Sequence, residues 1–277
     1  MFMSAITNFG DDNMHDFEVK EIYPNVFQLS DYRGLHVILI NGKNKSILWD
    51  MGFGVYDLKS ELKKLTDNEI MVFGSHGHLD HTLGCTQFDE VYVNKRDHKL
   101  FYKQNGFAIR RKVGQNLMKH NIYNKKQAFE YRHRKLPKLN DLPVGATYDL
   151  GGLTAEVVDL SGHTAGSVGL LIKEYRLFLT GDAVCNDLWI YLKESFSAKY
   201  CLETLKKTLK LPFDNYVCAH KSTIFPKEHI NSIIDVMEHL DPNTNNTRVL
   251  FRTTEVYECT KDTEYGTISI LYDESKL

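Results

Sequence analysis

This 277-residue sequence lacks several features that would place it outside the ordinary globular class. It has only five cysteines, which are odd in number, scattered and without a C-x-x-C pair, so we expect reduced thiols and no disulfide framework. Its apolar runs are of strand length, and none is long enough to span a bilayer. The first twenty residues show no apolar signal-peptide core. We therefore expect a cytoplasmic protein without a membrane segment.

A strong overall charge is also missing. The formal net charge is −2, which gives the whole molecule no general attraction for nucleic acid or for an anionic membrane. This average conceals a basic segment, residues 95–138, which holds fourteen of the 34 Lys and Arg residues but only two acids, Asp97 and Glu130. The sequence thus contains a basic block within an otherwise acidic chain.

The sequence does contain strands and helices that alternate in both halves. Short β-rich runs predict strands at residues 26–29, 35–40, 46–49, 69–73, 147–150, 155–160, 167–172, 177–179 and 215–218. Apolar periodicity predicts helices at residues 57–65, 199–211 and 226–240, the last with Pro226 in its first turn. The basic segment is mostly of helical pattern, and residues 249–272 contain two or three further strands. The class is therefore α/β.

A dense group of possible metal ligands follows the predicted strand at residues 69–73. The segment Ser75-His76-Gly77-His78-Leu79-Asp80-His81 places four ligand-type side chains within six residues. We expect Gly77 to let the backbone turn tightly, so that His76 and His78 face one ion. Imidazole nitrogen suits zinc. Asp80 and His81 lie further along the turn and can face a second ion.

Three more candidates follow apolar strands later in the chain. His163 stands in the loop Ser161-Gly162-His163-Thr164-Ala165-Gly166, Asp182 follows Thr180-Gly181, and His220 follows the strand at 215–218. Because the ends of strands at the open side of an α/β sheet gather site residues, we expect these side chains to meet. Each is weak evidence alone, and the ordered set carries the prediction.

The ordered motifs H-x-H-x-D-H, G-H-T-x-G-S, G-D and a lone histidine after a strand resemble the metallo-β-lactamase superfamily. Asp50, in Leu48-Trp49-Asp50-Met51-Gly52, matches that family's first motif. The resemblance runs over residues 19–240 and implies an αββα sandwich, in which two mixed sheets face each other with helices outside. We expect one domain over residues 1–277, with a basic helical insertion at about 95–140 and C-terminal strands at about 249–272.

The resemblance also implies roles for individual residues. His76, His78 and His163 correspond to ligands of a first metal, Asp80, His81 and His220 to ligands of a second, and Asp182 to the carboxylate between them. Asp50 is similar to the aspartate that supports the histidine loop from outside. The loops depart from the common pattern at Ala165 and Lys221, and neither departure removes a ligand.

These roles imply a hydrolase with two divalent ions. Zinc is the first expectation, and iron or manganese is also compatible with the ligand set. A hydroxide held at the metals would attack an ester, thioester, lactone or phosphoester, with the catalytic Asp80 orienting the nucleophile and moving a proton. We expect a small, anionic substrate, because the basic segment would attract it. Candidate substrate contacts are Arg110, Arg111, Trp189 and Tyr191.

Other functions stay open. A nucleic-acid or nucleotide phosphodiesterase is the main alternative, since the basic segment could bind phosphates, although no extra inserted domain of the family's nucleases is recognisable. A non-catalytic metal-binding sensor is a further alternative, which the full ligand set disfavours. A β-lactamase is disfavoured by the missing export signal, and a flavo-diiron oxidoreductase by the retained His78. The sequence leaves the oligomeric state open, with a homodimer as one option.

Overall fold

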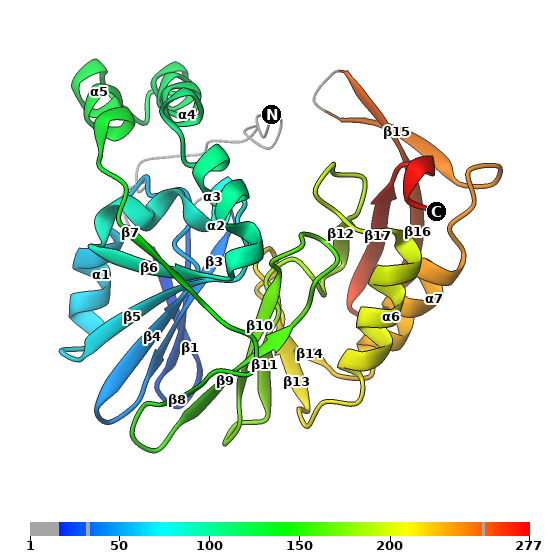
Figure 1. The fold of residues 1–277 in the computed structure, drawn as a ribbon, viewed down its shortest axis with the longest axis horizontal. Helices are drawn as coiled ribbons and strands as arrows, with labels where there is room; N and C mark the ends of the chain where they lie inside the picture. Colours follow the sequence, from blue (N-terminus) through cyan, green and yellow to red (C-terminus); the bar gives the residue numbers. More distant parts are fainter. Residues whose placement is uncertain (1–16, 32–33, 251–252) are drawn as a thin grey trace.

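The computed structural model describes residues 17–31, 34–250 and 253–277. Two β-sheets face each other with helices on their outer sides, and a third sheet lies toward the C-terminal side (Figure 1). The predicted α/β sandwich is confirmed, and the third sheet is an addition to it. The cysteines are all buried free thiols. Among the described residues, no helix combines the length and apolarity that crossing a membrane requires.

The first sheet has seven strands in the order of the chain. Its first four strands are antiparallel, and the pairs from β4 to β7 are parallel. The last strand, β7, begins at Lys138, so the end of the helical insertion expected at about 95–140 is a strand instead. The strands are β1 (Glu18–Tyr23), β2 (Val26–Ser30), β3 (His36–Asn41), β4 (Lys45–Trp49), β5 (Glu69–Gly74), β6 (Glu90–Val93) and β7 (Lys138–Asp141).

The second sheet has six strands in the order β14-β13-β11-β10-β9-β8. Its strands are β8 (Thr147–Asp149), β9 (Thr154–Asp159), β10 (Val168–Ile172), β11 (Leu177–Leu179), β13 (Asn215–Val217) and β14 (Phe225–Pro226). The prediction that Pro226 begins a helix is wrong. Pro226 pairs with Asn215 at the edge of this sheet, where a residue without an N–H is tolerated, and the helix begins at His229.

The two sheets enclose one apolar layer because side chains alternate along each strand. In β3, Ile38 and Ile40 point into the layer between the sheets, whereas Val37 and Leu39 belong to the apolar cluster on the opposite face. The inner layer continues into the second sheet through residues such as Leu170 on β10. Helix α1 covers the outer face of the first sheet with Leu58 and Leu62.

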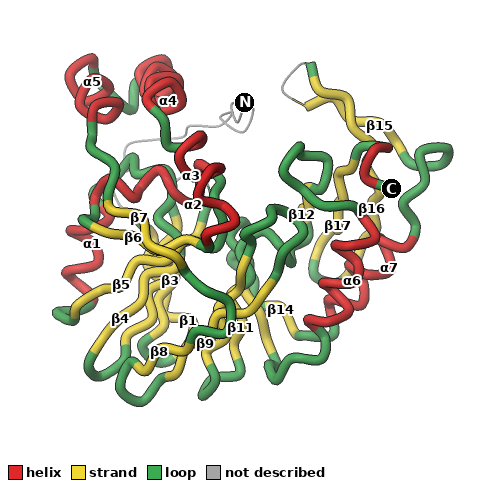
Figure 2. The backbone as a smooth tube through the Cα atoms, viewed as in Figure 1, coloured by secondary structure: helices red, strands yellow, loops and turns green. Residues whose placement is uncertain are grey.

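Helices cover the outer faces and the rim (Figure 2). They are α1 (Leu58–Leu65), α2 (Leu79–Thr82), α3 (His98–Gln104), α4 (Phe107–Lys119), α5 (Lys125–His133), α6 (Ala198–Thr208) and α7 (His229–Glu238), with short 3-10 turns at Leu83–Gln87, Lys95–Asp97 and Glu274–Lys276. Several begin with side-chain caps: Asp57 accepts from the Ser60 amide at α1, and Ser197 accepts from the Tyr200 amide at α6. The basic segment is thus mostly helical, as predicted.

The third sheet has the order β12-β17-β16-β15. Its strands are β12 (Asp187–Trp189), β15 (Asn246–Leu250), β16 (Thr254–Thr263) and β17 (Gly266–Tyr272). The strands β15, β16 and β17 lie in or overlap residues 249–272, where the sequence predicted two or three strands. Positions 251 and 252 of this tail lie outside the described residues. The strand β12 is unexpected: it leaves the middle of the chain to pair in parallel with β17.

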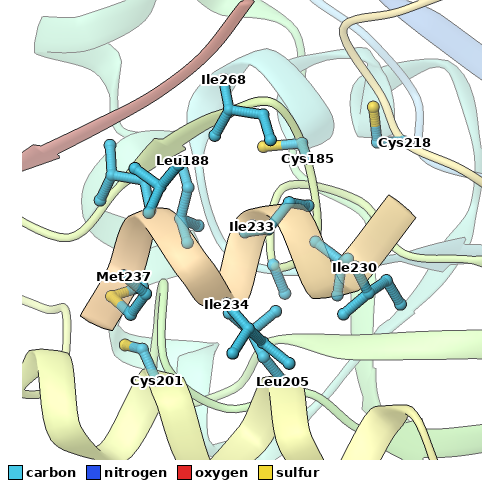
Figure 3. Packing of buried hydrophobic residues seen from close by; sticks show 14 of the residues in the cluster. Cys185, Leu188, Cys201, Leu205, Cys218, Ile230, Ile233, Ile234, Met237 and Ile268 are labelled. Carbon is cyan, nitrogen blue, oxygen red and sulfur yellow. The ribbon is translucent and has the colours of Figure 1, made fainter. Parts of the chain in front are cut away.

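A large apolar cluster joins the second sheet, α6, α7 and the third sheet. Figure 3 shows Ile230, Ile233, Ile234 and Met237 of α7 packed among side chains of the neighbouring elements, including Leu205 of α6. Phe178 of the second sheet and Ile270 of β17 belong to the same cluster, and both are fully buried. The third sheet is therefore packed against the sandwich through a shared core.

Candidate metal centre and its cavity

Polar side chains gather where the strands of both sheets end. The loop 75–81 follows β5, the loop 161–167 joins β9 to β10, Asp182 follows β11, and His220 follows β13. The structure brings all seven predicted metal ligands together there, in two groups. The first group is His76, His78 and His163, and the second is Asp80, His81, Asp182 and His220.

The first group presents three imidazole nitrogens to one point. Nε2 of His76 lies 2.8 Å from Nδ1 of His78, and Nε2 of His163 lies 3.0 Å from the same nitrogen. Burial, together with the neighbouring histidines, holds the pKa of His76 well below its usual value and lowers the pKa of His163 to about 4. Both rings are therefore neutral at physiological pH, which is the form that binds a metal ion.

The second group surrounds the carboxylate of Asp182. One of its oxygens lies 3.3 Å from Nε2 of His81, and the other lies 3.3 Å from Nε2 of His220. The oxygen near His81 also lies 3.8 Å from Nε2 of His163, so Asp182 adjoins both groups. Asp80 approaches His220 at 3.6 Å. His220 lies at the rim, with 37% of its side chain exposed, whereas the other four histidines of the two groups are buried.

Unpaired buried atoms show that this group fits a cation. Oδ1 of Asp80, Nε2 of His81 and Oδ1 of Asp182 are buried and have no hydrogen-bond partner among the described residues. Buried polar atoms are almost always hydrogen-bonded, and a buried carboxylate oxygen that lacks a hydrogen bond is costly. Histidine and carboxylate donors in this number suit zinc or another divalent first-row metal. A metal ion would supply the missing interactions.

The carboxylate of Asp50 supports the histidine loop, residues 75–81, through hydrogen bonds. This carboxylate accepts hydrogen bonds from the Ser75 amide at 2.7 Å and the Ser75 hydroxyl at 3.0 Å, and it lies 2.8 Å from Nδ1 of His81. Asp50 adopts a left-handed backbone conformation, with φ of 65°, where β4 ends. Because Nδ1 of His81 is engaged, Nε2 is the nitrogen that faces Asp80 and Asp182.

Two more histidines are oriented by a segment that the sequence did not single out for this role. The backbone carbonyl of Trp189 lies 2.8 Å from Nδ1 of His163, and the Glu194 carboxylate lies 2.9 Å from Nε2 of His78. The hydrogen bond from His78 is the main reason that the pKa of Glu194 falls to about 2, so this carboxylate is ionised. Trp189 is the last residue of β12 and Glu194 follows a few positions later, so a strand of the third sheet leads into both contacts.

A second missed residue is Asp97, one of the two acids in the basic segment. Its carboxylate is buried and accepts three hydrogen bonds, from the Gly77 amide at 2.8 Å, the Thr164 hydroxyl at 2.6 Å and the Gly166 amide at 2.8 Å. Asp97 therefore ties the loop of His76 and His78 to the loop of His163. The one sequence feature that could have drawn attention to Asp97 is that it is an acid among basic residues.

The role predicted for Gly77 needs a correction. Its φ is not in the left-handed region, so no special turn conformation requires glycine there. The reason is a close approach instead: a β-carbon at Gly77 would lie 3.1 Å from the Asp97 carbonyl oxygen and 3.1 Å from the Leu100 side chain. The absence of a side chain thus lets the histidine loop pack against the start of α3.

A cavity of about 380 Å³ opens beside His78. It lies between α3, α4 and the segment 191–194, and its walls include His78, Glu194 and Tyr191. Of the predicted substrate contacts, Tyr191 lines this cavity, whereas Arg110, Arg111 and Trp189 are not among its lining residues. The basic residues that line it are Lys103, Lys112 and Lys193.

Helix periodicity explains why Arg110 does not line the cavity. Arg110 is buried, and its guanidinium donates to the backbone carbonyl of Arg134, so it joins α4 to the end of α5. Arg111 is exposed on α4 outside the cavity. The face of α4 that lines the cavity is Ile109, Lys112, Val113 and Asn116, with the spacing i, i+3, i+4 and i+7 of one helix side. A run of three basic residues cannot share such a side.

Comparison with known proteins agrees with this arrangement. Residues 33–220 match the family described as the metallo-beta-lactamase superfamily. The human acyl-coenzyme A thioesterase MBLAC2 is 23% identical over 161 residues, which are 54% of this chain and 58% of that protein. A hydroxyacylglutathione hydrolase from Hyphomonas neptunium is 34% identical over 84 residues, or 28% of this chain and 31% of that protein.

The solved structures give a likeness of fold. A metallo-beta-lactamase from Pontibacter korlensis superposes with a TM-score of 0.59 at 15% sequence identity, covering 81% of this chain and 100% of that chain. The chain spans less than two thirds of the length of the curated relatives it matches.

Proposed function

This chain belongs to the metallo-β-lactamase superfamily, and we propose from that premise that it is a two-metal hydrolase of acyl thioesters and related esters. The relatives support this choice among the hydrolase substrates, since they are named as an acyl-coenzyme A thioesterase and a hydroxyacylglutathione hydrolase. Both names describe the release of an acyl group, which favours a carbonyl substrate over a phosphodiester.

The observation that carries the proposal is the position of Asp182 between the two ligand groups. Its carboxylate lies within 3.8 Å of ligand nitrogens of His81 and His220 in its own group and of His163 in the other, so it adjoins both groups. A carboxylate shared in this way is suited to neighbouring ions rather than to a single one. In the proposed site, His76, His78 and His163 hold one ion.

Asp80, His81 and His220 would hold the second ion, and Asp182 would be available to both. Zinc is our first assignment, since imidazole predominates in the first group. Iron and manganese also suit the mixed set of nitrogen and oxygen donors.

The proposed reaction is the hydrolysis of a carbonyl derivative. When bound, such ions lower the pKa of water from 15.7 to about 7 and polarise a carbonyl oxygen. Asp80 is the proposed catalytic carboxylate: it orients the attacking water and accepts its proton. The water oxygen bonds to the acyl carbon, the bond from carbon to sulfur breaks, and a proton passes to the leaving thiolate. The products are a carboxylic acid and a thiol.

Hydrolysis assays on metal-quantified protein test this proposal. The substrates are acyl thioesters, a lactone, a p-nitrophenyl phosphodiester and a β-lactam reporter. We expect turnover of the thioesters, with loss of at least 100-fold in kcat for Asp80→Asn, because the removal of a positioned acid or base costs about 10²–10⁴-fold. The matched control is Asp67→Asn, since Asp67 is exposed and precedes β5, whereas the histidine loop follows the other end of that strand.

Two outcomes would contradict the proposal. Preferential turnover of the phosphodiester would favour the phosphodiesterase alternative. Metal-loaded protein that turns over none of the panel would favour the sensor alternative.

A further inference from the structure

The cavity beside His78 has the composition of a binding site for an amphiphilic molecule. Its volume of about 380 Å³ falls within the range of about 300–1,000 Å³ that is typical of small-molecule sites. One end of it reaches His78 and Glu194, so a ligand in the cavity would lie directly beside the first ligand group. What occupies it therefore decides the substrate of the proposed hydrolase.

One wall of the cavity is apolar. Phe53 and Leu79 are nearly fully buried there, and Ile109 and Val113 of α4 add half-buried aliphatic surface one helical turn apart. Leu192 continues this wall from the segment after β12. Water against such a wall gains few hydrogen bonds, and its displacement by hydrocarbon is favourable. The wall therefore fits an aliphatic chain.

The polar part of the lining includes three lysines. Lys103 of α3, Lys112 of α4 and Lys193 all line the cavity and are exposed, so their charges lie toward its rim. The acidic residue in the lining is Glu194, and its carboxylate is engaged by His78. Three lysines, on α3, on α4 and in the segment after β12, thus line one cavity together with a single carboxylate, Glu194, whose pKa is lowered mainly by His78 and also by Lys103. Such an arrangement attracts an anionic group.

We propose that this cavity binds an acyl thioester that is apolar at one end and anionic at the other. The aliphatic acyl chain lies along Ile109, Val113 and Leu79, and a carboxylate or phosphate on the thiol part lies among Lys103, Lys112 and Lys193. The inference rests on the proposed function, and it adds the form of the substrate. The sequence predicted that Arg110 and Arg111 attract the anionic group of the substrate. The inference assigns this role to the lysines that line the cavity instead.

A series of thioesters with two to ten acyl carbons tests the apolar wall. In the native protein, kcat/KM should rise by up to about fourfold for each added methylene, its transfer free energy expressed as a ratio, until the cavity is filled. In Val113→Trp, the ratio of octanoyl to acetyl kcat/KM should fall at least tenfold. Ala108→Trp, an exposed position on α4 outside the cavity, should keep the native ratio. Equal ratios in both variants would overturn the inference.

The charged rim is tested with the same acyl chain on two thiols, an anionic one (3-mercaptopropionate) and a neutral one (N-acetylcysteamine). We expect Lys112→Glu to lower kcat/KM about tenfold for the anionic thioester and little for the neutral one. Arg111→Glu makes the same charge change at the adjacent position, which does not line the cavity. Equal effects of the two variants would show only general electrostatics and overturn the rim assignment. Lys112 is exposed, so this test stands even if Val113→Trp does not fold.

Binding of a non-hydrolysable thioether, the S-octyl derivative of 3-mercaptopropionate, separates the inference from the proposed function. Calorimetric binding that weakens in Lys112→Glu but not in Arg111→Glu would support the cavity assignment even if no thioester were hydrolysed. Turnover of thioesters without thioether binding and without chain-length preference would keep the proposed function and overturn the inference.

Discussion

The carboxylate of Glu194 lies 2.9 Å from Nε2 of His78, and this contact fixes which nitrogen of His78 faces His76 and His163. An ionised carboxylate on Nε2 holds the proton there and leaves the lone pair on Nδ1, where the other two ligand nitrogens converge. Glu194 comes from the segment after β12, so an element that pairs with the C-terminal sheet orients a ligand of the histidine loop.

Replacement of Glu194 should weaken metal binding at the first ligand group. We expect Glu194→Ala to lower the affinity for Zn²⁺ roughly 10- to 100-fold, the usual cost of losing the outer partner of a ligating histidine. Glu194→Gln should have a smaller effect, because its amide oxygen can still accept from His78. Competition with a chromogenic chelator measures the affinity. Exposed Glu203 of α6 provides the control Glu203→Ala, and equal affinities in both alanine variants would rule out the orienting role.

Asp97→Asn should loosen the connection between the two histidine loops. An asparagine has one side-chain acceptor oxygen where the carboxylate has two, so its amino group must face the Gly77 or Gly166 amide. A buried donor left without a partner costs about 1–3 kcal/mol. We expect a loss of this size in the free energy of unfolding of the metal-free protein, measured with urea, and weaker Zn²⁺ binding. Exposed Asp89→Asn is the control, and an unchanged unfolding free energy in Asp97→Asn would contradict the account.

His36 should make the metal-free protein less stable in mild acid. Burial, helped by the nearby His220, lowers its folded pKa to about 4 from the usual 6.5. The unfolded chain therefore binds a proton between pH 6.5 and pH 4 that the folded chain does not, and stability falls as the pH falls through this window. We expect His36→Asn to recover about 1–3 kcal/mol of that loss. The unfolding free energy at several pH values measures it, and a slope equal to that of the native protein would refute the assignment.

The packing of the third sheet can be tested at Ile270 of β17. This side chain is fully buried in the cluster shared with α7. Ile270→Ala should lower the unfolding free energy by about 2–5 kcal/mol, the range for such a truncation in a core. Val249→Ala, at a position that is 63% exposed, should change it by less than about 0.5 kcal/mol. Similar small effects at both positions would mean that the third sheet is not part of the cooperative fold.

The sequence predicted the parts of this molecule that depend on local pattern. Strand β5 and the ligand cluster that follows it are adjacent in the chain, so an apolar run followed by four ligand types indicated a site. The positions of His163, Asp182 and His220 followed from strand ends, because polar groups there meet at one edge of a sandwich.

Contacts between distant segments could not be predicted in this way. Nothing near Glu194 indicates His78, which lies 116 positions away. The three-residue strand β12 is too short to carry an alternating pattern, and only its partner β17 makes it a strand. Residue types alone do not show which side of α4 faces the cavity. The sequence therefore suggested Arg110 as a substrate contact, whereas Lys112 is the basic residue of α4 that lines the cavity.

The central claim, that two ions share Asp182, is tested most directly by measuring metal content together with thioester turnover during stepwise reconstitution with Zn²⁺. The account predicts two equivalents per chain, with turnover that rises with the second equivalent, and about one equivalent with little turnover in Asp182→Ala. Full turnover at a single equivalent, or unchanged metal content and turnover in Asp182→Ala, would contradict it.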